Sequence, residues 1–182
     1  DLNRLLMDID GMLSRKINLP DIKSMAHWAS GDADHMATLW SAVCSADRLT
    51  SVNALWVMTH LCESESEWLR SRQDMIIDML LSATDVAKKR MLLQILKTQD
   101  FDAGTMRADL LDFCLSKINS ECEPYSIRAF SIYVAFRMAR HYPELIAELR
   151  EYLKMLSFQG MSPGLACARR NTLAEIRRIE AG

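Results

Sequence analysis

The sequence has 182 residues, of which 49% are apolar and 25% are charged, and its formal net charge is −2. This composition is ordinary for a soluble globular domain, and a pI near 6.1 argues against a strongly basic nucleic-acid-binding domain. Six glycines, four prolines and the lack of sustained polar–apolar alternation argue against a sheet protein. No apolar run approaches the roughly 20 residues that span a bilayer, and the first residues show no signal-peptide pattern. We therefore expect one cytoplasmic domain without membrane contact.

Helix start and stop signals divide the chain into pairs of helices. Residues 1–30 are expected to form one or two leading helices, one of them starting at Asp21 after Pro20, that cap the open end of a helical stack. The first helices of the pairs, called A helices, are predicted at about 32–44, 65–82, 105–118 and 143–157. The second helices, called B helices, are predicted at about 47–63, 84–98, 123–141 and 162–180.

Capping residues set several of these boundaries. Asp32 is predicted to cap the helix that follows it, and either Thr84 or Asp85 is predicted to start the second B helix. Ser64, with Glu67 three residues later, has the spacing of a capping box, and Thr105 after a glycine is expected to open the third A helix. Every segment after residue 20 thus reads as helix.

A sequence motif, which we call the repeated phrase, recurs in the B helices. It consists of an acidic residue, a basic residue about five positions later, and then large apolar residues at helical spacing. It begins at Asp47, Asp85 and Glu123. We interpret the apolar pairs of the copies as core, and they are Leu55/Met58, Leu92/Ile95, Phe130/Tyr133 and, more loosely, Leu173/Ile176. A period near 40 residues is typical of stacked helical hairpins that bury their apolar stripes against their neighbours.

The repeat predicts an all-α, right-handed superhelix over residues 1–182. It consists of a helical cap at 1–30 and about four hairpins at 32–63, 65–98, 105–141 and 143–180. Such an array presents an elongated surface, which is typical of a binding scaffold.

Several stretches resemble a known family. The openings of two B helices, Asp85-Val86-Ala87-Lys88-Lys89-Arg90 and Glu123-Pro124-Tyr125-Ser126-Ile127-Arg128, resemble the second helix of HEAT repeats. Four further stretches are similar to small bacterial HEAT-like proteins: Trp28-Ala29-Ser30-Gly31-Asp32, Asn53-Ala54-Leu55-Trp56-Val57, Tyr142-Pro143-Glu144-Leu145 and Ser162-Pro163-Gly164, the last followed by Arg169-Arg170. The resemblance implies a HEAT/armadillo-like solenoid whose B helices line the concave side. Members of the family often carry the name adenylosuccinate lyase.

The two helix types carry opposite charge. The four B segments have net charges of −1, +3, +2 and +2, and the A-side segments 21–44, 65–82, 102–118 and 143–157 have −2, −2, −1 and −1. With the B helices on the concave side, as the resemblance implies, the concave face is moderately basic. Such a face would attract acidic peptides or a nucleic-acid backbone.

The candidate partner-binding residues are basic or aromatic. Favourable helix-dipole positions do not account for the basic ones, because these residues lie in the first half or middle of their helices. Trp28 and Trp68 are expected to be partly exposed and to serve as anchors. An alternative for Arg90 and Arg128 is an inter-repeat ladder of contacts with acidic residues. The candidates are Lys88, Lys89, Arg90, Arg128, Arg169, Arg170, Trp28 and Trp68.

No arrangement of residues predicts a catalytic, metal or cofactor site. The five cysteines are scattered and read as reduced core residues, and His27, His35, His60 and His141 are not paired with obvious reacting partners. Leu6-Met7-Asp8-Ile9-Asp10-Gly11 resembles the nucleophile motif of haloacid-dehalogenase phosphatases, but its apolar spacing also fits an amphipathic helix.

The sequence therefore supports a non-enzymatic scaffold that binds an unidentified protein or acidic peptide on its basic concave face. One alternative is nucleic-acid binding, because some alkylpurine DNA glycosylases are built from HEAT-like repeats. A second alternative is the lyase activity that the family's common name suggests, although only Ser162-Pro163-Gly164 resembles the catalytic loop of that enzyme class. Neither the partner nor the oligomeric state follows from the sequence.

Overall fold

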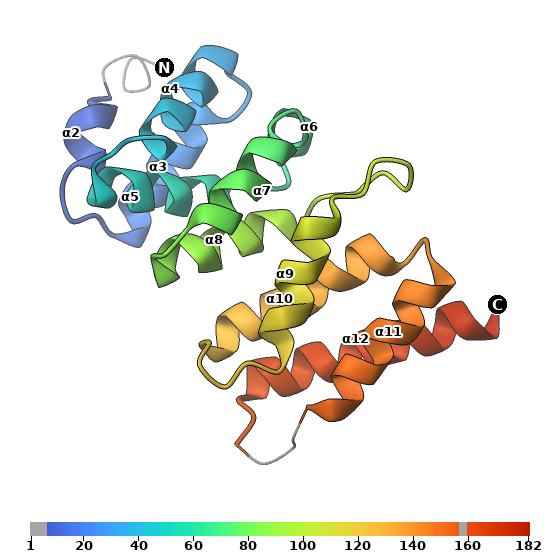
Figure 1. The fold of residues 1–182 in the computed structure, drawn as a ribbon. Helices are drawn as coiled ribbons and strands as arrows, with labels where there is room; N and C mark the ends of the chain where they lie inside the picture. Colours follow the sequence, from blue (N-terminus) through green and yellow to red (C-terminus); the bar gives the residue numbers. More distant parts are fainter. Residues whose placement is uncertain (1–6, 157–159) are drawn as a thin grey trace.

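The computed structural model describes residues 7–156 and 160–182, and within them it contains eleven α-helices and no strand. The all-helical prediction is therefore confirmed. Figure 1 shows the helices following one another in chain order, with the amino-terminal and carboxyl-terminal helices at opposite ends. Part of the predicted cap, residues 1–6, lies outside the described residues. The helices are α2 (Ile9–Leu13), α3 (Leu19–Ala29), α4 (Ala33–Val43), α5 (Arg48–Thr59), α6 (Ser66–Arg70), α7 (Gln73–Ser82), α8 (Val86–Leu96), α9 (Ala108–Ile118), α10 (Tyr125–Ala139), α11 (Pro143–Met155) and α12 (Pro163–Ala181).

The helices after α3 form two layers. We call α4, α6, α7, α9 and α11 the A layer, and α5, α8, α10 and α12 the B layer. Successive B-layer helices pack against one another more extensively than successive A-layer helices do, as expected for the inner side of a solenoid. The helices α2 and α3 pack against α5 and α4.

Most B-layer helices have a side chain that caps their first turn. Asp47 and Asp85 accept hydrogen bonds from first-turn N–H groups of α5 and α8, and Ser162 does the same for α12. In α3, Asn18 and Asp21 form a capping box, so this helix begins at Leu19 rather than at Asp21.

The second A helix is broken, although the sequence predicted one helix over 65–82. Two short helices, α6 and α7, replace it, and the expected capping box of Ser64 and Glu67 is not formed. Glu65 occupies the N-cap position of α6 without capping it, because its carboxylate accepts hydrogen bonds from the Ser30 hydroxyl at 3.1 Å and the Gly31 N–H at 2.6 Å. A contact with the loop between α3 and α4 thus overrides the local capping pattern.

The third A helix begins at Ala108, three residues later than the predicted start at Thr105. The preceding loop is held by its own tertiary contacts, since Phe101 is buried and the Arg107 guanidinium reaches Asp78 of α7. These contacts favour the loop over an earlier helical turn.

The register of α10 differs from the predicted repeat. Pro124, rather than Glu123, is its N-cap, one position later than the acidic residue of the phrase. The residues that α10 buries most completely are also different from the apolar pair assigned from the repeat. Phe130 and Tyr133 are only partly buried, whereas Ile132 is fully buried. Their interpretation as core residues was wrong.

One apolar core runs along the array, with members from Ile9 to Ile176. Asn53 is a buried polar residue inside this core, and its side-chain amide donates to the carbonyl oxygens of Leu13 at 2.8 Å and Arg15 at 2.9 Å. This contact ties the end of α2 to the middle of α5.

Candidate interaction surface

Each B-layer helix presents one partly exposed stripe, because its other sides are buried by the A layer and the neighbouring B-layer helices. We call the surface formed by these stripes the B face. Its residues are Val52, Trp56, Thr59 and His60 from α5 and its C-cap, Arg90, Gln94 and Lys97 from α8 and its C-cap, Phe130, Tyr133, Phe136 and Arg137 from α10, and Arg170, Asn171 and Glu175 from α12.

Lys97 lies near the centre of the B face and reaches from the end of α8 to α10. Its Nζ is 4.8 Å from the centroid of the Phe130 ring and 5.6 Å from that of Tyr133. Its position at the C-cap of α8 favours a positive charge, and both ring faces attract the ammonium group. No ion pair among the described residues involves Lys97.

Two cavities meet at Lys97, which lines both. We call them together the B-face furrow, which crosses the array from α5 to α12. The first has a volume of about 280 Å³ and is also lined by Thr59, His60, Cys62, Glu63, Gln94 and Thr98. The second has a volume of about 360 Å³ and is also lined by Tyr133, Phe136, Arg137, Asn171, Thr172 and Glu175.

Arg137, the other cation of the second cavity, is held by residues of the preceding repeat. Its Nε donates to the carbonyl oxygen of Gln99 at 2.6 Å, and its Nη2 lies 2.9 Å from an Asp100 carboxylate oxygen. Of the two cations Lys97 and Arg137, only Arg137 forms an ion pair with a carboxylate among the described residues, so the charge of Lys97 stays unpaired.

The predicted basic cluster at the start of α8 does not form one patch. Lys88 lines a separate cavity beside Arg48 at the edge between α5, α7 and α8. Lys89 points towards the next repeat, where its Nζ lies 3.7 Å from a carboxylate oxygen of Glu123. Arg90 is exposed on the B face. Successive helical residues diverge by about 100°, so three in a row cannot share one face.

Arg128 and Arg169 hold their hairpins together. The Nε of Arg128 donates to the Ile118 carbonyl oxygen at 2.9 Å, and the Nε of Arg169 donates to the Leu153 carbonyl oxygen at 2.8 Å. Both acceptors lie in the last turn of the preceding A helix, where carbonyl groups lack intrahelical partners. Arg170, next to Arg169, is exposed on the B face.

The predicted ladder between repeats uses other basic residues than those expected. Arg48 Nε lies 2.6 Å from an Asp85 carboxylate oxygen, and Glu123 contacts both Lys89 and Lys117, the latter at 3.0 Å. The acidic residues of the repeated phrase thus join consecutive repeats. The backbone N–H of Lys88, followed by the Arg48 guanidinium, holds the pKa of Asp85 below its ordinary value.

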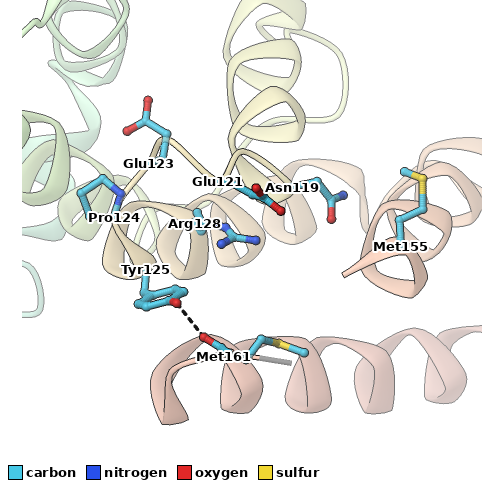
Figure 2. A pocket seen from close by; sticks show the side chains of 9 residues that line it. Asn119, Glu121, Glu123, Pro124, Tyr125, Arg128, Met155 and Met161 are labelled. Atoms are coloured by element: carbon cyan, nitrogen blue, oxygen red, sulfur yellow. Dashed lines mark hydrogen bonds between the residues drawn. The ribbon is translucent and has the colours of Figure 1, made fainter. Parts of the chain in front are cut away.

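Arg128 also lines a cavity of about 610 Å³ near the loops that follow α9 and α11 (Figure 2). Tyr125 closes one side of it by donating its hydroxyl to the Gly160 carbonyl oxygen at 2.6 Å. Since Arg128 is fixed by Ile118, its position in this cavity follows from a contact within the hairpin.

The two predicted tryptophan anchors do not lie on the B face. Trp28 was expected to be partly exposed, but it is buried, and its ring stacks on His35 with 3.9 Å between centroids. Trp68 belongs to α6 in the A layer, where the Arg72 guanidinium covers its ring at 3.7 Å. Trp56 is the tryptophan of the B face, and it is partly buried.

The main B-face side chains, namely Lys97 and the aromatic residues of α10, were not among the binding residues predicted from the sequence. A signal for part of this surface was present, because Arg90, Gln94 and Lys97 follow helical spacing and form a polar stripe on α8. The aromatic residues were hidden because the repeat alignment placed Phe130 and Tyr133 in the core.

The residues that the sequence suggested for catalysis have other roles or lack partners for a metal site in the described part of the chain. Asp8, from the phosphatase-like motif, caps α2 by accepting a hydrogen bond from the Gly11 N–H at 3.0 Å. Residues 7–156 and 160–182 contain no group of three or more His, Cys, Asp or Glu side chains able to hold a metal ion. Two cysteines that were read as core residues, Cys44 and Cys122, are exposed.

Across the described residues, none of the helices combines the length and apolar character that crossing a bilayer requires.

Comparison with known proteins identifies one family. The HEAT repeat domain matches residues 9–176, nearly the whole chain. No curated protein and no solved structure matches it.

Proposed function

Because the chain belongs to the HEAT repeat domain family, we propose that it is a non-enzymatic protein-interaction scaffold whose B face binds a segment of a partner protein. Stacked helical hairpins bury their apolar stripes against each other and leave one extended surface for recognition. Two candidate surfaces are available in this array, one on the B face and one on the A layer, and they carry different side chains.

The observation that carries the proposal is the combination of aromatic rings and unmatched positive charge on the B face. Phe130 and Tyr133 are partly exposed beside Lys97, while Arg90 and Arg170 are exposed on the neighbouring helices. Aromatic and arginine side chains dominate the binding energy of protein interfaces, and uncompensated cations attract acidic partners.

Two arginines on the side of the A layer provide a contrast, since Arg70 and Arg107 contact carboxylates, whereas Arg72 lies over the Trp68 ring. Arg70 lies 2.7 Å from an Asp102 oxygen, and Arg107 contacts Asp78 at 2.7 Å and Asp109 at 2.8 Å. The charges of Arg70 and Arg107 are matched within the protein, which makes them less available to a partner than the exposed Arg90 and Arg170 of the B face.

Nucleic acid is a second candidate, because aromatic rings beside cations also suit a single strand. The net charge of −2 and the presence of Glu63 and Glu175 in the furrow favour a protein segment instead. A gel shift with single- and double-stranded DNA at about 50 mM salt tests this, since contacts with phosphates are strongest at low salt. We expect no shift, and a salt-dependent shift would favour nucleic acid.

The scaffold proposal is tested by capturing partners from the native host with a tagged chain. Arg90→Glu/Arg170→Glu reverses two B-face charges. Lys23→Glu/Lys154→Glu is a matched control, because it changes the net charge equally at exposed positions on α3 and the A-layer helix α11. We expect the B-face variant to lose the partners that the wild type and the control retain.

Two results would contradict the proposal. One is equal retention of partners by the B-face variant and the control, with folding verified by circular dichroism. The other is turnover of adenylosuccinate by the purified chain, which would assign it an enzymatic role instead.

A further inference from the structure

Resting on the proposed scaffold function, we propose that the B-face furrow binds an extended peptide with an acidic side chain and, two residues away, a large apolar one. The acidic side chain contacts Lys97. The apolar side chain enters the adjoining cavity beside Tyr133 and Phe136.

The acidic position follows from the environment of Lys97. This ammonium group is held by two aromatic rings, and no carboxylate among the described residues pairs with it. Ring faces attract a cation but do not neutralise it, so the charge remains available to an anion. Contacts with the rings also displace water from the ammonium group, which strengthens its attraction to a carboxylate.

The apolar position follows from the cavity of about 360 Å³, which has Tyr133 and Phe136 in its wall and Lys97 at its rim. The volume lies near the lower limit for small-molecule pockets, so it suits a large side chain. Because Lys97 lines this cavity too, the acid and the apolar group must be close neighbours. In an extended chain, residues i and i+2 point to the same side.

Carboxylates in the furrow also limit how many acidic side chains a bound peptide can place there. Glu63 lines its α5 side and Glu175 lines its α12 side. Both carboxylates disfavour further acidic groups near the ends, so one acidic side chain at the centre matches the charge pattern.

The path of the furrow favours an extended segment. It crosses α5, α8, α10 and α12, and packed helices lie about 8–10 Å apart, which gives a path of roughly 25–30 Å. Extended chain covers about 3.3 Å per residue, so roughly eight or nine residues span it.

Fluorescence anisotropy with labelled synthetic peptides tests this inference. The probes are Ser/Gly-rich peptides of about nine residues with a central Glu-x-Phe, Gln-x-Phe, Lys-x-Phe or Glu-x-Ser. We expect Glu-x-Phe to bind tightest, and replacing either Glu by Gln or Phe by Ser to weaken binding about tenfold.

Variants of Lys97 make the test specific. Lys97→Gln should remove the preference for Glu over Gln, and it places no negative charge at the helix end. Lys97→Glu should reverse the preference towards Lys-x-Phe. Lys88→Gln is the matched control, because Lys88 is on the same helix but outside the furrow, and it should leave all affinities unchanged.

Equal binding of the Glu and Gln peptides to the wild type would overturn the inference, as would an unchanged preference in folded Lys97→Gln. Tighter binding of single-stranded oligothymidylate than of any peptide would also overturn it. If native partners depend on Arg90 and Arg170 but the peptides show no acid preference, this inference fails and the scaffold function stands. If the charge reversals release no partner, the scaffold function itself fails.

Discussion

Basic side chains between neighbouring repeats and basic side chains on the B face have different surroundings. Between repeats, Arg107 contacts three aspartates, and Lys89 shares Glu123 with Lys117. On the B face, Lys97 contacts aromatic rings instead, and no ion pair in the described part of the chain includes it. The net charge of a segment therefore does not reveal which of its cations a partner can reach. Pairing within the fold decides that.

The largest expected difference in stability is between a substitution on the buried side of α10 and one on its B-face side. Ile132→Ala leaves a cavity in a fully buried position and should lower the free energy of unfolding by about 3 kcal/mol. Phe130→Ala removes a partly exposed ring and should cost about 1 kcal/mol. Urea denaturation of both variants measures the difference. Equal losses would show that the assigned register of α10 is wrong.

A smaller effect is expected from a cation that joins two repeats. The aspartates around Arg107 hold its pKa above the ordinary value, with the hydrogen bond to Asp109 contributing most. Arg107→Ala should lower the free energy of unfolding by about 1 kcal/mol, because its partners are largely exposed and screened by water.

Arg90→Ala is the B-face counterpart of that variant and should change the free energy of unfolding by less than about 0.5 kcal/mol. Thermal and urea unfolding of the pair measure both values. A larger loss from Arg90→Ala than from Arg107→Ala would break the distinction between structural and available cations.

Another small effect concerns the acidic residue that starts α8. Asparagine caps a helix as well as aspartate does, so Asp85→Asn removes mainly the charge attraction to Arg48. We expect a loss of about 0.5 kcal/mol at neutral pH.

The pH dependence of Asp85→Asn follows from the direction of the Asp85 pKa. The folded-state pKa is below the unfolded one, so the contribution is complete above the unfolded value and disappears as pH falls through the folded value. The stability of the wild type and the variant should therefore converge below about pH 4. A difference that stays constant from pH 7 to pH 3 would contradict the ion pair.

The fold could be largely predicted from the sequence because apolar spacing and caps are local signals. Asp47, Asp85 and Ser162 begin their helices as predicted. The break between α6 and α7 could not be predicted in this way. The loss of the expected capping box before α6 could not be predicted either, because the Glu65 carboxylate contacts Gly31, which is far away in the sequence.

The candidate surface was less predictable, because side-chain direction depends on register and on partners in three dimensions. Phe130 and Tyr133 are only partly buried on α10, although the repeat aligns them with fully buried pairs of α5 and α8. Arg128 and Arg169 have the same sequence character as exposed arginines, but each donates to a backbone carbonyl of the preceding helix. Such bonds leave no local pattern in the sequence.

Site-specific crosslinking tests whether partners bind the B face. A photoreactive phenylalanine derivative at Phe130 probes the B face, and the same group at Met75, an exposed residue of the A layer, is the control. We predict that a captured native partner crosslinks from position 130 and not from position 75. Crosslinking from position 75 alone would show that partners bind the A layer and not the B face.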